Sequence, residues 1–285
     1  IKFYSADPTT TNEVLADVQI GTEATQAVVD SSPVIRGNSL YTIVAGPSWA
    51  QAETNAERIG GRLTEIGDLG ENIFLQTSDM VSSMTNWGAW IGLTRRNGYY
   101  DPSTGKTYGD WKWTSGNLYG SGNEIVGWNP NFFASGDGGG NEDVHMYTKD
   151  TTGGWNDVPQ GWWQPGAVDS GIAEIPLSLS VSWSGWAITG IPGIKEGAGT
   201  FVTAINLSAG TPTTGNLADG STVYWMISGI TQDDLSSGTM SGSGAIINGN
   251  LFVLQSLAID SDAGENFEVS VFSDKQMTQQ IGKTY

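Results

Sequence analysis

Acid and amide side chains gather at the two ends of one short segment, GGNEDVHMYTKDTTGGWND, which spans residues 139–157. These side chains are Asn141, Glu142, Asp143, Asn156 and Asp157. Between the two ends lie an alternating stretch, which predicts a strand, and a glycine-rich turn. Carboxylate and amide oxygens bind hard cations such as calcium, and they also accept hydrogen bonds from polyols. The same pattern is typical of a solvated hairpin, so the segment alone leaves both interpretations open.

A second acidic run, IDSDAGENFE, spans Ile259–Glu268. It carries Asp260, Asp262, Glu265 and Glu268 at one edge of a predicted strand. The spacing does not match the calcium loop of an EF-hand. The run therefore predicts either a solvated turn or a calcium site between two domains.

Composition excludes several classes of partner. The chain has 285 residues and a net charge of −18, from 30 acids and 12 bases. Binding to nucleic acid or to an anionic membrane surface needs clustered lysine and arginine, so neither partner is expected. We expect no membrane span either, because no stretch reaches the roughly eighteen consecutive apolar residues that one requires. The high content of glycine, with 40 residues, and the scarcity of bases favour an extracellular, β-rich protein.

The side chains needed for common catalytic sites are also missing. There is no cysteine, and His145 is the only histidine. A zinc site or a serine–histidine–aspartate triad would depend on that one residue. His145 stands in a predicted strand, so we interpret it as a structural side chain and expect the protein not to be an enzyme.

Two helices are predicted in the middle of the chain. The first follows Pro47 and the capping residue Ser48, and it ends at Gly60-Gly61. Its apolar residues follow a three-to-four spacing: Trp49, Ala52, Ala56 and Ile59. The second is predicted within GDLGENIFLQTSDMVSSM, with an apolar face of Ile73, Leu75, Met80 and Met84. Strands are expected at AWIGLT and DWKWTSG, and the long polar and aromatic loop that follows, up to Gly140, is a candidate binding surface.

Motifs in this region occur in the order found in C-type lectin-like domains, and residues 38–177 resemble that family. The first motif, YTIVAGPSWAQAETNAERIGGRLTEIGDLGENIFL, resembles the family's opening strand and helices. AWIGL, DWKWTSG, GNEDVHMY, GGWND and GIAEIPL resemble its later strands in sequence. The resemblance implies an α+β fold for this domain. Its core is expected to include Trp90, Ile91, Leu93, Trp111, Trp113 and Trp155.

The chain departs from the family at its disulfides. The resemblance places the partners of the first bond at Ala56 and Ala173, and those of the second near Val144 and Gln160. Both members of each pair are absent, so the fold is expected to depend on packing. Burial of large aromatic side chains contributes a few kcal/mol each, about the size of a disulfide's roughly 2–4 kcal/mol.

The chain also departs from the family in the long loop. Sugar-binding relatives carry Glu-Pro-Asn or Gln-Pro-Asp shortly before the Glu-Asp strand, whereas this chain has WNPNFFASGDGGGNED. Either Asn129-Pro130-Asn131 or Asp137 replaces the usual motif, and the sequence leaves both alignments open. The resemblance implies a calcium ion bound by Asp137, Glu142, Asn156 and Asp157. The ligand-binding surface would further include Trp128, Asn129, Asn131 and Asn141.

The two ends of the chain have a different character. Residues 178–285 resemble the Calx-β or immunoglobulin-like β-sandwich repeats of large bacterial or phage surface proteins, on the motifs YWMISG and DDLSSG with alternating strands around them. FYSADPTTTNEV near the start resembles VFSDKQMTQQIG near the finish. Residues 1–37 are therefore predicted to hold the closing strands of a preceding sandwich repeat and a linker. The start at Ile1 predicts a processed chain or a piece of a longer protein.

These observations predict an α+β C-type lectin-like domain plus all-β sandwich domains, located at a cell surface, in a secreted filament or on a virion. The expected function is recognition of a glycan or surface protein, assisted by calcium, within a long adhesin or fibre. Two alternatives stay open. One is a structural protein that associates with its own copies in a filament or particle. The other is a receptor-binding protein that does not use calcium.

Overall fold

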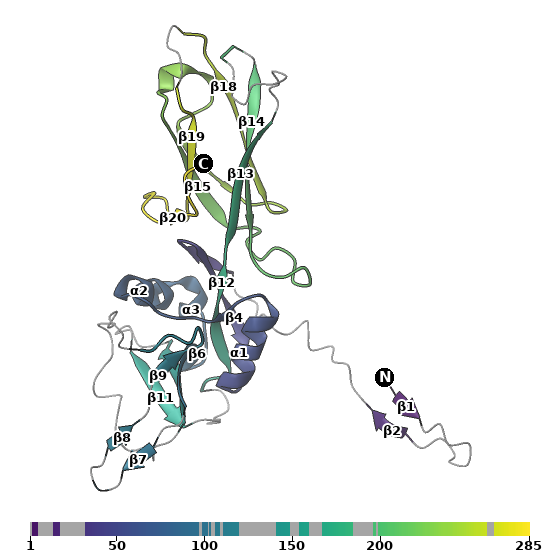
Figure 1. The fold of residues 1–285 in the computed structure, drawn as a ribbon, viewed down its shortest axis with the longest axis vertical. Helices are drawn as coiled ribbons and strands as arrows, with labels where there is room; N and C mark the ends of the chain where they lie inside the picture. The colour runs from purple at the N-terminus through teal and green to yellow at the C-terminus, as the bar shows by residue number, and fades with distance from the viewer. Residues whose placement is uncertain are drawn as a thin grey trace.

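The computed structural model shows a chain that is mostly β-sheet with few helices (Figure 1). The structure describes residues 2–4, 14–17, 32–96, 99–101, 103, 106–108, 111–119, 141–148, 154–159, 167–184, 196–197, 199–260 and 265–285. Among these residues, no helix is long and apolar enough to cross a membrane.

The first large unit is built on an eight-stranded sheet in which the neighbours run β11-β10-β6-β12-β4-β3, with β5 beside β12 and β9 beside β6. Its strands are β3 (Val34–Arg36), β4 (Ser39–Ala45), β5 (Arg62–Leu63), β6 (Gly88–Arg95), β9 (Trp111–Trp113), β10 (Glu142–Tyr147), β11 (Trp155–Pro159) and β12 (Ser170–Pro176). Among the described strand pairs of this sheet, only that of β6 and β12 is parallel. The sheet therefore begins at Val34, slightly before the boundary expected at residue 38.

The first predicted helix is confirmed as α1 (Trp49–Arg58). Ser48 is its N-cap and accepts a hydrogen bond from the backbone N–H of Gln51. Ala52 and Ala56 are fully buried and pack the helix onto the sheet. The capping residue and the three-to-four spacing thus predicted the helix and its buried face correctly.

The second predicted helical segment is helical but divided in two, and part of its predicted face is wrong. The segment forms two helices, α2 (Leu69–Thr77) and α3 (Asp79–Ser82). Ser78 ends the first and caps the second, because its side chain accepts from the N–H of Val81. Leu75 and Met80 are buried as expected, but Ile73 is exposed. The polar residues Glu71 and Asn72 of α2 are buried instead, because each forms a hydrogen bond in the core.

The second large unit consists of two four-stranded antiparallel sheets. One has the order β13 (Ser178–Ser184), β14 (Thr200–Ser208), β18 (Asn250–Leu257) and β16 (Leu235–Ser237). The other has the order β17 (Ser241–Ala245), β15 (Thr222–Ser228), β19 (Glu268–Phe272) and β20 (Gln280–Ile281). A 3₁₀ helix, η2 (Gln232–Asp234), precedes β16. Phe201, Ile205, Val223, Trp225 and Val271 are buried in this unit, as in a β-sandwich.

Two short hairpins complete the described strands. The first pairs β1 (Lys2–Tyr4) with β2 (Val14–Asp17), and the second pairs β7 (Tyr99–Asp101) with β8 (Lys106–Tyr108). The segment 271–282 that resembles the start of the chain includes the hairpin of β19 and β20. Both similar segments therefore contain antiparallel strands, and the origin of residues 1–37 in a preceding repeat stays a prediction.

The predicted core of the first unit is confirmed at most positions. Trp90, Ile91, Leu93, Trp113 and Trp155 are buried. The exception is Trp111, which is only partly buried. The two alanines at the expected disulfide positions, Ala56 and Ala173, are both fully buried in one hydrophobic cluster, whereas Gln160 lies outside the described residues.

The two units are joined by covalent continuity and by direct contacts. Only Leu177 separates β12 from β13. The backbone N–H of Gly37 donates to Ser273 Oγ at 3.1 Å, and that of Gly282 donates to Asn38 Oδ1 at 2.6 Å. One hydrophobic cluster contains residues of both units, including Ile175 and Ile205. The turn between β3 and β4 therefore attaches the sandwich to the first sheet.

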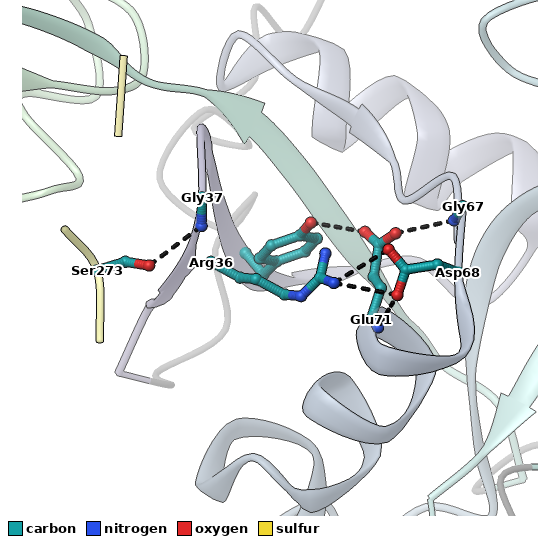
Figure 2. A network of polar contacts seen from close by, with 7 residues as sticks. Arg36, Gly37, Gly67, Asp68, Glu71 and Ser273 are labelled. Atoms are coloured by element: carbon teal, nitrogen blue, oxygen red, sulfur yellow. Dashed lines mark hydrogen bonds and ion pairs between the residues drawn. The ribbon is translucent and has the colours of Figure 1, made fainter. Parts of the chain in front are cut away.

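A polar network continues from that turn into the first unit (Figure 2). Arg36 donates to both carboxylate oxygens of Asp68 at 3.0 Å. Asp68 caps α2 by accepting from the N–H of Glu71 at 2.7 Å. Glu71 in turn accepts from the Tyr41 hydroxyl at 2.6 Å and from the N–H of Gly67 at 2.8 Å. The network thus fixes the first turn of α2 relative to β3 and β4.

Candidate functional site

The hairpin of β10 and β11 carries the candidate ligands that fall within the described residues. The register pairs Glu142 with Pro159 and Val144 with Asp157. Positions 142 and 157 are therefore diagonal neighbours, two residues apart on adjacent strands and on positions of the same parity. Such neighbours have Cβ atoms about 7–8 Å apart or slightly less, a separation that one ion can bridge between two carboxylates.

The same register separates the two residues of the Asn156-Asp157 pair. Asn156 pairs with His145, so it lies on the opposite face of the hairpin from Asp157, because successive strand residues alternate. Both side chains are half-buried. Asp157 therefore shares a face of the hairpin with position 142, whereas Asn156 lies on the other face.

Trp155, the first residue of β11, anchors the hairpin in the core at the end opposite to Glu142. It is 1% exposed, and its indole N–H donates to Asn72 Oδ1 on α2 at 2.8 Å. Its ring also meets that of Trp113 edge-on, with centroids 5.9 Å apart. The interpretation of Trp155 as a core residue beneath the hairpin is confirmed. The buried Asn72 could not have been identified from sequence, because its partner is 83 positions away.

Asp143 has a structural role that the sequence analysis missed. It is 4% exposed, and its Oδ1 accepts from Arg96 at 2.6 Å and from the Thr94 hydroxyl at 3.0 Å. The guanidinium of Arg96 therefore balances the charge of the Asp143 carboxylate. The sequence did hold one signal for this role: two adjacent arginines, Arg95 and Arg96, follow the predicted strand AWIGLT in a strongly acidic chain.

The two arginines also contact aromatic rings. The guanidinium of Arg95 lies 4.8 Å from the ring centroid of Trp111, and that of Arg96 lies 5.1 Å from that of Trp49. Trp49 further donates its indole N–H to the carbonyl of Ile91 at 2.8 Å. Cation–π contacts and hydrogen bonds therefore hold the ends of β6, β9 and α1 together beside the hairpin.

His145 is buried, as expected for a structural strand residue. It is 4% exposed, and its ring meets the Trp90 ring edge-on with centroids 5.9 Å apart. Burial lowers the pKa of His145 to about 4 from its ordinary value of 6.5. The side chain is consequently neutral at physiological pH and packs as an aromatic residue.

Most of the long-loop candidates lie outside the described residues. These are Trp128, Asn129, Asn131 and Asp137. The choice between Asn129-Pro130-Asn131 and Asp137 as the replacement for the family motif therefore stays open. Asn141 is described, and it is exposed immediately before β10. The predicted ligand set is thus brought together in register only for Glu142 and Asp157.

The described residues meet part of what calcium requires. Calcium takes about six to eight oxygen ligands, from carboxylates, carbonyls and water. The hairpin carries acids at positions 142 and 157, which the register makes diagonal neighbours. The donor type fits the ion, and the remaining ligands would come from the long loop or from a bound hydroxyl compound.

A second acidic cluster lies in the sandwich. Carboxylate oxygens of Asp234, Asp260 and Glu265 all lie within 4.8 Å of one another. Asp234 accepts from the N–H and the hydroxyl of Thr231, and these hydrogen bonds lower its pKa. All three acids belong to the sandwich unit, and the interdomain calcium site at this run stays a prediction. Asp262 lies outside them.

A hollow of about 320 Å³ lies elsewhere in the first unit. Its charged lining residues already have partners: Arg62 donates to the carbonyl of Thr114 at 2.6 Å, and Glu174 accepts from the Ser39 hydroxyl at 2.6 Å. Glu65 accepts from Asn117 at 3.1 Å. This hollow is lined by β5, β12 and the turn after β9, and not by the β10–β11 hairpin.

Comparison with known proteins identifies neighbours of C-type lectin-like fold. Two structures of human lithostathine match with TM-scores of 0.37, at 19% and 18% identity, and cover 51% and 56% of this chain and 98% of their own. The C-type lectin CEL-I from Cucumaria echinata matches with a TM-score of 0.31 at 16% identity, over 51% of this chain and 96% of its own. At these scores the likeness carries no argument about function. No protein-family model and no curated protein matches the chain.

Proposed function

We propose that this chain is an extracellular recognition module in which a C-type lectin-like domain, attached to a β-sandwich, binds a surface glycan or receptor with the help of calcium. The observation that supports the proposal most directly is the diagonal placement of positions 142 and 157 at the end of the β10–β11 hairpin. Both positions carry acids, and the segment between residues 119 and 141 adjoins this end in sequence.

The chemistry of the site favours a hydroxyl-rich ligand. An ion held by two carboxylates keeps several coordination positions for other oxygens, since calcium accepts about six to eight. Vicinal hydroxyls of a sugar can fill two of them while donating hydrogen bonds to the same carboxylates. Asn141 and the long-loop residues would then determine which sugar fits.

We propose binding without catalysis. The only histidine of the chain is buried against Trp90, with its pKa lowered to about 4. It is therefore not positioned to exchange protons with a ligand at neutral pH. Asp143, the acid nearest to Glu142 in sequence, is occupied by Arg96.

Calorimetric titration with calcium tests the metal part of the proposal. We expect heat of binding for the natural chain and its loss in Glu142→Gln and Asp157→Asn. Glu57→Gln, which changes an exposed acid of α1, is the matched control and should bind as the natural chain does. Asp260→Asn reports separately on the sandwich cluster. Loss of heat only in Asp260→Asn would contradict the proposed site.

A glycan array read with and without a chelator tests the ligand part. We expect signals that disappear with the chelator and in Asp157→Asn. Signals that survive both changes would instead support a receptor-binding protein that does not use calcium. No signal on any glycan would refute the lectin function.

A structural role in a filament or particle is the second candidate. One observation favours it: the sandwich has an uncharged outer sheet face with exposed apolar side chains. An assembled filament in which this face is buried between subunits would decide in favour of the structural role.

A further inference from the structure

The outer face of the sheet formed by β13, β14 and β18 combines exposed apolar residues with a complete lack of charge. Along each strand, inward residues such as Phe201, Thr203 and Ile205 are buried and alternate with outward ones. The outward positions are Ser178, Ser180, Ser182 and Ser184 on β13, Thr200, Val202, Ala204, Asn206 and Ser208 on β14, and Asn250, Phe252, Leu254 and Ser256 on β18. We call this set the serine–phenylalanine face.

Its centre is apolar. Phe252 is 59% exposed and Leu254 is 63% exposed. The register places Ala204 opposite Phe252 and Val202 opposite Leu254, so the four side chains lie together on neighbouring strands. Serines of β13 border Ala204 and Val202 on their other side. An apolar centre with a polar, uncharged border is the general composition of a protein-binding surface.

The sandwich charges that the structure describes all lie elsewhere. Among its described residues, acids and bases occur in turns and loops or on the other sheet: Glu196, Asp219, Asp233, Asp234, Asp260, Glu265, Glu268, Asp274, Lys275 and Lys283. None of the outward strand positions of the serine–phenylalanine face is charged. Burying this face therefore carries no cost for desolvating an ion.

The C-terminal residues of the chain lie beside β19 in the other sheet. Tyr285 exchanges backbone hydrogen bonds with Val269, and the hydroxyls of Thr284 and Ser270 lie 2.8 Å apart. Ser270 and Phe272 of that sheet are buried, whereas Met226 of β15 is 39% exposed. The serine–phenylalanine face has the same sheet geometry, but its central Phe252 and Leu254 stay largely exposed.

We propose that the serine–phenylalanine face binds the same face of a second copy of this chain. The net charge of −18 makes two copies repel each other over most of their surfaces. An uncharged face is where two such chains can come into contact without opposing carboxylates. Contact of identical faces about a two-fold axis brings Phe252 and Leu254 of one copy onto the equivalent apolar centre of the other.

The size of the face implies weak association. Three strands spaced about 4.8 Å apart, over about seven residues of about 3.3 Å each, cover roughly 330 Å² per copy. The two copies together bury about 700 Å², less than the roughly 1,200–2,000 Å² of stable complexes. Pairs should therefore form at high micromolar concentration, and several sandwiches in one chain would strengthen the contact through avidity.

Sedimentation velocity on the full chain tests the proposal. We expect a reversible monomer–dimer equilibrium that strengthens between about 20 and 300 mM NaCl, because salt screens the repulsion. Leu254→Asp should weaken it at least tenfold, since a symmetric contact brings two new carboxylates together. Ile247→Asp, at an equally exposed position (65%) in the turn before β18, should leave it unchanged. A chain that stays monomeric throughout, or equal effects of both variants, would overturn the proposal.

Cross-linking provides a second test that does not depend on an equilibrium constant. The chain has no cysteine, so a single introduced thiol reports only on its own position. Ala204→Cys, in the centre of the face, should form a disulfide-linked dimer on mild oxidation. Ser243→Cys, exposed on the outer face of the other sheet, should stay monomeric. Equal cross-linking at both positions, or none at Ala204→Cys, would contradict a contact through this face.

Discussion

The buried histidine makes the stability of the first unit depend on pH in a defined direction. Burial lowers the pKa of His145 to about 4 from 6.5 in the unfolded chain. Below pH 6.5 the unfolded state binds a proton that the folded state excludes. The stabilisation is therefore complete above pH 6.5 and is lost as the pH falls from about 6.5 to about 4.

The magnitude follows from the two pKa values. At pH 5 the unfolded state gains about 2 kcal/mol relative to the folded state, and the difference grows to about 3 kcal/mol at lower pH. The free energy of unfolding is typically only about 5–15 kcal/mol for a domain, so an effect of this size is measurable.

The assay is urea denaturation at pH 8 and at pH 5, followed by tryptophan fluorescence, of the natural chain and of His145→Asn. The variant loses packing against Trp90 at both pH values, so only the difference between the two pH values is informative. We expect this difference to be about 2 kcal/mol smaller in the variant. The pKa of Glu71 is raised by burial, which acts in the opposite direction, but it contributes equally to both proteins and cancels. Equal pH dependence in the two proteins would refute the reasoning.

Five further substitutions, at three places in the fold, have expected effects on the free energy of unfolding, each measured by urea denaturation. Asp143→Ala leaves a partly buried guanidinium without its carboxylate and should cost about 2–3 kcal/mol; a cost below about 0.5 kcal/mol would argue against the ion pair. Asp68→Ala removes the N-cap of α2 and should cost about 1 kcal/mol, whereas Arg36→Ala removes only an exposed ion pair and should cost less; the reverse order would contradict the capping role. Gly229→Ala should cost about 2–4 kcal/mol, because φ is +82° and a Cβ would lie 1.8 Å from a carbonyl oxygen. Gly215→Ala, where φ is +70° and nothing lies within 4 Å of the new Cβ, should cost only about 1 kcal/mol. Equal costs would show that the close contact at Gly229 relaxes.

Local signals in the sequence predicted local structure well. The cap at Ser48 and the spacing of Ala52 and Ala56 predicted α1 and its buried face, because a helix needs only near neighbours to set both. The buried tryptophans of β6 and β9 were likewise evident from strand-like, aromatic motifs. Trp111 is the exception: it is only partly buried, and the guanidinium of Arg95 lies 4.8 Å from its ring centroid.

Hydrogen-bond partners that are distant in the sequence determine the features that local patterns did not predict. The inward face of α2 holds Glu71 and Asn72, which are buried because Tyr41 and Trp155 hydrogen-bond to them. A pattern of hydrophobic residues places Ile73 inward instead, and that prediction was wrong. The role of Asp143 is similar, since its arginine partner is 47 positions away in the chain.

The candidate site was predictable in composition and only partly in geometry. The flanking acids were evident from the segment itself, but the strand register determines which of them are neighbours. It brings Glu142 and Asp157 together and directs Asn156 to the other face. A one-residue shift in register would have reversed this arrangement, and no local signal in the sequence fixes it.

Crystals soaked with terbium, and measured for anomalous scattering, test the central claim most directly. Terbium replaces calcium at oxygen sites and scatters strongly enough to be located without ambiguity. The account predicts a peak bonded to the carboxylates of Glu142 and Asp157, with remaining ligands from the long loop or from added sugar. A peak found only among Asp234, Asp260 and Glu265, or no peak beside Asp157, would contradict it.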